Sequence, residues 1–223
     1  MLATHMFATD NNDYLPYPSW GGVERDCWAY AANLPGAAGN DSPTIISNQL
    51  QYAKRGQLGP YLTVDVFMCP KDVTDSKTGV KKVRFKERTI KITSYSFNGA
   101  IIAYQSQPAS LTTSKFKVTA LRPTGILLWE ANEDMTAYNF NDVGNQPHEG
   151  ISQRHGSAKV AKDQTDSVGG VATFGNLSGA AFTIPMRRWF SPALAGKNIW
   201  PATQNPAGPN DAWYNPDSKD GTF

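Results

Sequence analysis

Apolar positions along the chain occur in short runs, and the spacing within a run predicts the type of element. In residues 1–8, apolar positions 2, 3, 6 and 7 have the spacing of one helix face. This helix is expected to end at Asp10-Asn11-Asn12-Asp13, where asparagine readily adopts the left-handed conformation. No capping residue precedes the helix, as expected for the last turns of a longer one. Residues 48–61 are weakly helical until Gly56.

Other runs have the pattern of strands. The clearest is Gly125 to Glu130, a short apolar run of the buried-strand type. Segments 170–174 and 179–184 are separated by little more than Asn176-Leu177-Ser178 and predict a hairpin. Further strands are predicted at 82–92 and 93–102, and a short strand or extended segment at 62–69. From Pro185 onward, aromatic residues lie among prolines, glycines and asparagines, which predicts coil that packs through its rings.

Composition supports one large domain of strands and long loops. Hydrophobic residues make up 40% of the 223 positions and charged residues 18%, with 19 glycines and 15 prolines. The net charge of +2 and the scattered basic residues argue against a nucleic-acid-binding protein. In the one basic stretch, residues 81–88, apolar residues interleave with charges, which favours a strand with one solvated face.

The two cysteines, Cys27 and Cys69, are too few to form a zinc site by themselves. A cytosolic chain could leave both reduced, whereas in an exported chain they could form one disulfide, with a gain of a few kcal/mol in stability. The sequence contains no run of about 18 apolar residues and no signal-peptide pattern.

Candidate metal ligands are few. Asp217 and Asp220 precede Gly221 in a form that resembles a calcium loop, and a polar turn is the alternative. His148-Glu149 and His155, with Asp142 and Asp163 nearby, could contribute to a mononuclear site, although a histidine bonded to loop backbone is the simpler interpretation. The candidate metal ligands are therefore Asp217 and Asp220, with Ca²⁺ as the ion, and separately His155 in a mononuclear site. Nothing has the spacing of a nucleophile–base or carboxylate pair, so no enzyme is expected.

Several motifs resemble one family when read in order. Phe7-Ala8-Thr9-Asp10-Asn11-Asn12-Asp13-Tyr14-Leu15-Pro16 resembles the exit from the long N-terminal helix of pilin-like proteins abundant in Verrucomicrobia and Planctomycetes. Val66-Phe67-Met68-Cys69-Pro70-Lys71-Asp72 is similar to that family's Val-Phe-x-Cys-Pro-x-Asp, and Ser94-Tyr95-Ser96-Phe97-Asn98-Gly99 to its Ser-Tyr-x-Tyr-Asn-Gly. Thr124 to Glu130 resembles its central strand.

Arg154-His155-Gly156 resembles the start of the family's signature, a histidine followed after about ten residues by Phe-x-Asp-Gly-His-Val. The chain departs from that pattern at Phe174-Gly175-Asn176-Leu177-Ser178-Gly179, where the aspartate is missing and Asn176 is at best a partial substitute.

The resemblance implies a structural subunit, a pseudopilin of an extracytoplasmic filament in a type II secretion or type IV pilus-like system. It implies a hydrophobic helix of about 20 residues before this chain, which anchors the subunit in the inner membrane and then packs in the filament core. Its partners would be other copies or other pseudopilins and an inner-membrane assembly platform. The protein would be located in the periplasm or at the cell surface.

The expected fold is therefore α+β, with the end of a long N-terminal helix packed on an antiparallel sheet, as in a pilin-like head domain. Residues 1–13 would be the helix end and residues 14–223 one globular head, coil-rich from about 185. The alternative is a cell-surface carbohydrate- or ligand-binding protein, because Trp20, Trp200, Trp213 and Tyr214 lie in loop-like sequence and could stack on sugars.

Overall fold

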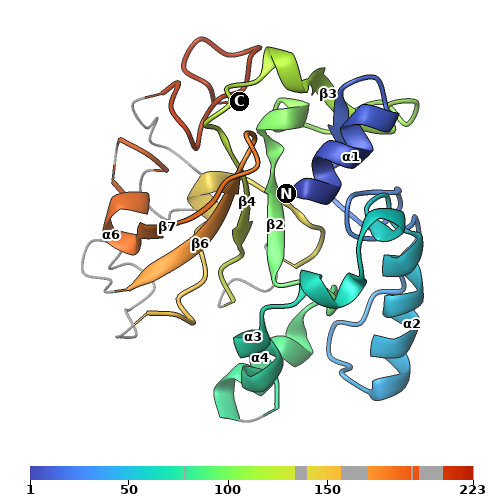
Figure 1. Ribbon diagram of the computed structural model, residues 1–223. Helices are drawn as coiled ribbons and strands as arrows, with labels where there is room; N and C mark the ends of the chain where they lie inside the picture. Colours follow the sequence, from blue (N-terminus) through green and yellow to red (C-terminus); the bar gives the residue numbers. More distant parts are fainter. Residues whose placement is uncertain (78, 134–139, 157–169, 192, 196–207, 223) are drawn as a thin grey trace.

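The computed structural model describes residues 1–77, 79–133, 140–156, 170–191, 193–195 and 208–222 (Figure 1). They form an α+β fold with one five-stranded and one two-stranded sheet. Within the described residues, no helix is both long and apolar enough to cross a membrane.

The larger sheet has the strand order β5-β2-β4-β6-β7. Its strands are β2 (Tyr95–Asn98), β4 (Ile126–Glu130), β5 (Gly144–Asn145), β6 (Val171–Asn176) and β7 (Ala181–Pro185). The strand at 125–130 and the hairpin are confirmed, the hairpin with Thr173 opposite Thr183. The prediction of a purely antiparallel sheet is wrong at one edge, because β5 runs parallel to β2.

The smaller sheet pairs β1 (Tyr14–Pro16) with β3 (Thr113–Lys117). Helix α1 (Leu2–Asp10) leads into β1, as the apolar spacing predicts. The chain turns between them through Asn12 and Asp13, whose φ angles of 55° and 67° are left-handed. Short polar residues tolerate this conformation, which explains the expected helix end at the Asp-Asn-Asn run.

The remaining helices surround the sheets, and α3 and α4 lie together beyond one end of β2 (Figure 1). The α-helices are α2 (Pro43–Arg55), α3 (Pro70–Asp75), α4 (Gly79–Glu87) and α6 (Met186–Trp189). The 3₁₀ turns are η1 (Gly59–Tyr61), η2 (Val64–Phe67), η3 (Gly99–Ile102), η4 (Val118–Ala120) and η5 (Pro147–Glu149).

Two strand predictions are wrong. Residues 79–87 are helical. Phe85 and Arg88 are buried and lie three positions apart, whereas Val83 is 55% exposed. This spacing fits one face of a helix and does not fit a strand with alternating burial. Residues 62–69 contain the 3₁₀ turn η2 instead of a strand.

The C-terminal segment completes the core. The amide of Asn98 on β2 donates to the carbonyl of Ile126 (2.9 Å) and to that of Ala212 (2.8 Å). The backbone N–H of Ile126 donates to Asp211 O (2.7 Å), and the hydroxyl of Tyr214 donates to Ile126 O (3.0 Å). Trp213 and Tyr214 are buried, as expected for a segment that packs through its rings.

Candidate functional site

A buried network of charged side chains lies where α3, β2, β4 and residues 151–155 meet. The Asp72 carboxylate accepts two hydrogen bonds from Arg88, at 2.7 and 3.0 Å, and one from Ser94 Oγ at 2.7 Å. Arg154 Nη2 lies 3.1 Å from Asp72 Oδ1, and its Nη1 donates to Glu130 Oε2 at 3.3 Å. These five side chains are all buried, so the network is a built part of the domain interior.

Local sequence explains how Asp72 and Cys69 are placed. Pro70 occupies the first turn of α3, where its missing N–H and fixed φ are tolerated, so Cys69 is the N-cap and Asp72 lies in the first turn. Ser94 joins the two, because its hydroxyl accepts from the Cys69 N–H (2.9 Å) and donates to Asp72. The Cys-Pro-x-Asp motif therefore places a thiol and a carboxylate against the start of β2.

Glu130 ends β4 and connects this network to a second group of side chains. Its Oε1 lies 3.3 Å from His155 Nε2, and the same nitrogen lies 3.5 Å from Cys69 Sγ. The atoms that Cys69, Glu130 and His155 offer as ligands all lie within 4.8 Å of one another. Cys69 and Glu130 are buried, whereas the His155 side chain is 35% exposed, so the group opens to solvent on the histidine side.

Burial and charge shift the pKa values in this network. Burial by itself raises the pKa of Asp72, but Arg88, Arg154 and the hydrogen bonds outweigh it and hold the pKa below its usual value. Burial lowers the pKa of Arg154, but Asp72, Glu133 and Glu130 more than offset it, so the net shift is upward. Burial, with a contribution from Glu130, raises the pKa of the Cys69 thiol.

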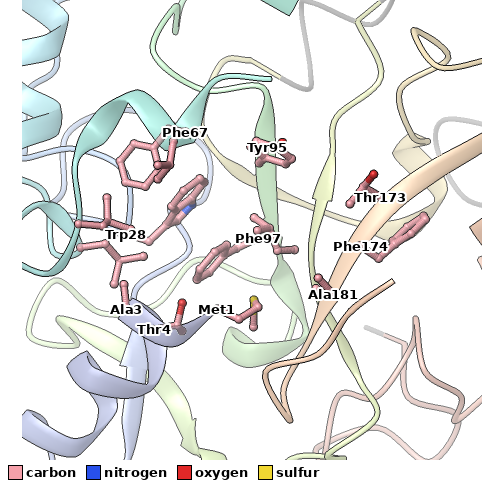
Figure 2. Close-up of a pocket in the computed structure, with 15 residues that line it drawn as sticks. Met1, Ala3, Thr4, Trp28, Phe67, Tyr95, Phe97, Thr173, Phe174 and Ala181 are labelled. Carbon is pink, nitrogen blue, oxygen red and sulfur yellow. The ribbon is translucent and has the colours of Figure 1, made fainter. Parts of the chain in front are cut away.

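An apolar cavity of about 290 Å³ lies on another side of β2 (Figure 2). Met1 and Thr4 of α1 border it, Trp28 and Phe67 line one wall, and β2, β4 and β6 line the rest. Trp28 stacks on Phe97 with ring centroids 4.5 Å apart and meets Phe67 edge-on at 5.1 Å. The lining has few polar groups, so the cavity supplies apolar contact surface and no chemistry.

Of the two alternatives left open for the cysteines, the structure has the reduced one: Cys27 and Cys69 are free, buried thiols, and the possible disulfide is not formed. Their surroundings differ: Cys27 lies beside Ala29 and Tyr30, whereas Cys69 faces Glu130 and His155. Burial raises the pKa of Cys27 to about 12, which leaves that thiol unreactive at neutral pH.

The two candidate calcium ligands, Asp217 and Asp220, have partners within the chain. Asp217 forms an ion pair with Lys115. Asp220 accepts from the Ser218 hydroxyl and from both the hydroxyl and the N–H of Thr222, which holds its pKa below the usual value. These contacts fit a polar turn, which was the alternative to a calcium loop at these two residues. Among the described residues, neither shares a cluster of potential metal ligands with His155.

His148 does not join His155 either. It stacks on Trp213 with centroids 5.7 Å apart and planes within 7°, and burial lowers its pKa to about 4. Asp142 accepts backbone N–H groups from Gly21 (2.5 Å) and Gly144 (2.9 Å). Asp163 lies outside the described residues.

Two of the four candidate sugar-stacking residues, Trp213 and Tyr214, are inaccessible. Trp213 is 1% exposed and donates its ring N–H to Ala195 O, and Tyr214 is 4% exposed. Trp20 is partly buried against Tyr104, with centroids 6.3 Å apart, and Trp200 lies outside the described residues. Stacking on Trp213 or Tyr214 is therefore corrected to packing in the core.

Sequence reasoning placed no function on Arg88, Ser94, Glu130 or Arg154, although three of them belong to the quoted motifs. The available signal was that Glu130 ends an apolar run of the buried-strand type, where a charged residue is unusual unless it is paired. No protein-family model matches the chain, and no curated protein or solved structure matches it either.

Proposed function

We propose that this protein is a pilin-like structural subunit, a pseudopilin of an extracytoplasmic filament of the type II secretion or type IV pilus-like kind. It would be anchored in the membrane before assembly by a hydrophobic helix upstream of these residues. In the filament, the domain described here would form the outer surface and the contacts between subunits.

The observation that supports the proposal is that the motifs behind the family resemblance meet in space. Asp72 comes from the Cys-Pro-x-Asp motif, Ser94 from the motif at the start of β2, Glu130 from the central strand and Arg154 from the Arg-His-Gly motif. All four lie in one buried hydrogen-bonded network. Chance matches scattered over 83 positions, from residue 72 to residue 154, have no reason to meet at one place, so the motifs behave as parts of one structural unit.

Helix α1 has the two faces that a filament subunit needs. Its inner face buries Ala3, Phe7 and Ala8, and Phe7 meets Tyr61 edge-on at 6.2 Å. Its outer face presents Leu2, 76% exposed, and Met6, 45% exposed. Four positions apart on a helix, these two side chains lie on one stripe and offer apolar contact to a neighbouring copy.

The gene upstream of Met1 gives the most direct test. The reading frame should continue upstream into an apolar helix of about 20 residues preceded by a prepilin peptidase cleavage site. A native start codon at Met1, with neither feature before it, would contradict the proposal.

Crosslinking in the native cell tests the assembly itself. With the full-length protein, Met6→Cys should form disulfide-linked dimers on mild oxidation, because the stripe on α1 contacts the next subunit. Val83→Cys is the matched control: Val83 is 55% exposed and belongs to α4, a helix that lies away from α1 (Figure 1), so this variant should stay monomeric. A monomeric Met6→Cys protein, or equal crosslinking at both sites, would refute the proposed packing.

A further inference from the structure

We infer that Cys69, Glu130 and His155 form a binding site for a single divalent transition-metal ion, with Zn²⁺ as the best match. Cys69 Sγ, Glu130 Oε1 and His155 Nε2 would be the protein ligands. The site is independent of the filament proposal, because it rests on geometry and ligand chemistry alone.

The distances between the ligand atoms fit a tetrahedral ion. Zn–S bonds of about 2.3 Å and Zn–N or Zn–O bonds of about 2.0–2.1 Å, at tetrahedral angles, place S and N about 3.6 Å apart and N and O about 3.3 Å apart. In the structure, Cys69 Sγ lies 3.5 Å from His155 Nε2, and that nitrogen lies 3.3 Å from Glu130 Oε1. Two of the three distances between ligand atoms therefore match a tetrahedral ion, and the third, between Cys69 Sγ and a Glu130 carboxylate oxygen, is at most 4.8 Å.

The ligand types select the class of metal. One thiolate, one imidazole and one carboxylate suit zinc and its spectroscopic substitute cobalt, whereas Ca²⁺ requires six to eight oxygen ligands. The exposed side of His155 leaves the fourth position open to water. Ca²⁺, the ion considered from sequence for the loop with Asp217 and Asp220, does not fit this set.

The surrounding network holds the ligands in position. Arg154 pairs with Oε2 of Glu130, which leaves Oε1 directed at His155, and Ser94 fixes the backbone of Cys69. Supporting contacts of this kind are typical of metal sites.

The charges of the network also favour a cation. Two guanidinium groups, Arg88 and Arg154, face three carboxylates, Asp72, Glu130 and Glu133. With a neutral Cys69 thiol, these two positive and three negative charges sum to −1. A divalent ion that displaces the thiol proton into solvent adds one net positive charge.

Metal titration of the chelator-treated, reduced protein tests the site. Wild type should bind one Zn²⁺ per chain in competition with a chromogenic chelator. His155→Gln should bind more than about 100-fold more weakly, beyond the loss typical for a supporting residue. His5→Gln, in α1, is the matched control and should keep wild-type affinity. No stoichiometric binding by wild type, or unchanged affinity in His155→Gln, would overturn the proposal.

Cobalt identifies the sulfur ligand. Co²⁺-loaded wild type should show a thiolate-to-cobalt charge-transfer band, which should disappear in Cys69→Ser and persist in Cys27→Ser. The reverse pattern would overturn the assignment of the ligand.

Thermal unfolding separates loss of binding from loss of fold. Free Zn²⁺ at a hundredfold excess over Kd should raise the wild-type Tm by roughly 5–11 °C. His155→Gln should unfold near the metal-free wild-type temperature and show no zinc-dependent rise. A zinc-dependent rise of equal size in both proteins would place the ion elsewhere.

Discussion

The buried Asp72 carboxylate contacts two buried guanidinium groups, and its removal should lower the stability of the fold. Asp72→Asn keeps the shape of the side chain but leaves Arg88 and Arg154, both buried, without their shared anion. Breaking a buried ion pair by removing one partner costs about 3–5 kcal/mol. For a domain of this size, that loss lowers Tm by roughly 6–20 °C.

Urea unfolding of chelator-treated protein, followed by tryptophan fluorescence, measures this loss. The matched control is Asp217→Asn, because Asp217 pairs with Lys115 while its side chain stays 46% exposed, and such a pair contributes less than about 1 kcal/mol. Combining Asp72→Asn with Arg88→Met should recover part of the loss, since the uncompensated guanidinium is gone. A loss at Asp72 as small as the control, or strictly additive variants, would refute the reasoning.

The pH dependence follows from the same carboxylate. Its folded-state pKa lies below the unfolded value, so the unfolded chain binds more protons between the two values. The stabilisation is therefore present above the unfolded pKa, about 3.9, and is lost as pH falls through the folded pKa. Wild type and Asp72→Asn should approach equal stability in acid.

Three further predictions concern other parts of the core. The folded-state pKa of His148, about 4, lies below the unfolded value near 6.5, so stability should fall by up to about 3 kcal/mol as pH drops from 6.5 to 4; His148→Phe should lack this slope in acid unfolding curves. Trp189→Ala should cost about 3–5 kcal/mol in urea unfolding, because Trp189 is fully buried with its ring 4.9 Å from that of Phe174; a loss below 1 kcal/mol would contradict this. Gly144→Ala should cost about 1–3 kcal/mol, since a Cβ there overlaps the Ser19 carbonyl, whereas Gly36→Ala has room and should be close to neutral in the same assay.

The parts of the fold that could be predicted from sequence are those set by local patterns. The hairpin follows from two apolar runs around a short turn, and β4 from an apolar run that is uninterrupted on both faces. A strand was predicted in place of the helix at residues 79–87, because charged residues alternate there with Val83 and Phe85 at the two-residue spacing typical of a strand. The helix forms there because tertiary contacts bury Phe85 and Arg88, which no local pattern records.

The candidate site could be found only in part, for a similar reason. His155 was identified as a potential ligand, but its candidate partners, His148, Glu149, Asp142 and Asp163, were residues close to it along the sequence. Its actual neighbours, Glu130 and Cys69, are 25 and 86 residues away along the chain. One sequence contains no information about such pairings, and for Cys69 it offered a reduced thiol or a disulfide with Cys27 as alternatives.

The attachment of the C-terminal segment to the central strands has a consequence for synthesis. The Asn98 amide donates to the carbonyl of Ala212, which is 114 residues later in the chain. The carbonyl of Ile126 accepts from the hydroxyl of Tyr214, which is 88 residues later. Closing such distant contacts is slow, and it cannot begin until residues 208–222 have emerged from the ribosome. Until then the nascent chain lacks these contacts to β2 and β4, so a chaperone that shields apolar strands has time to bind.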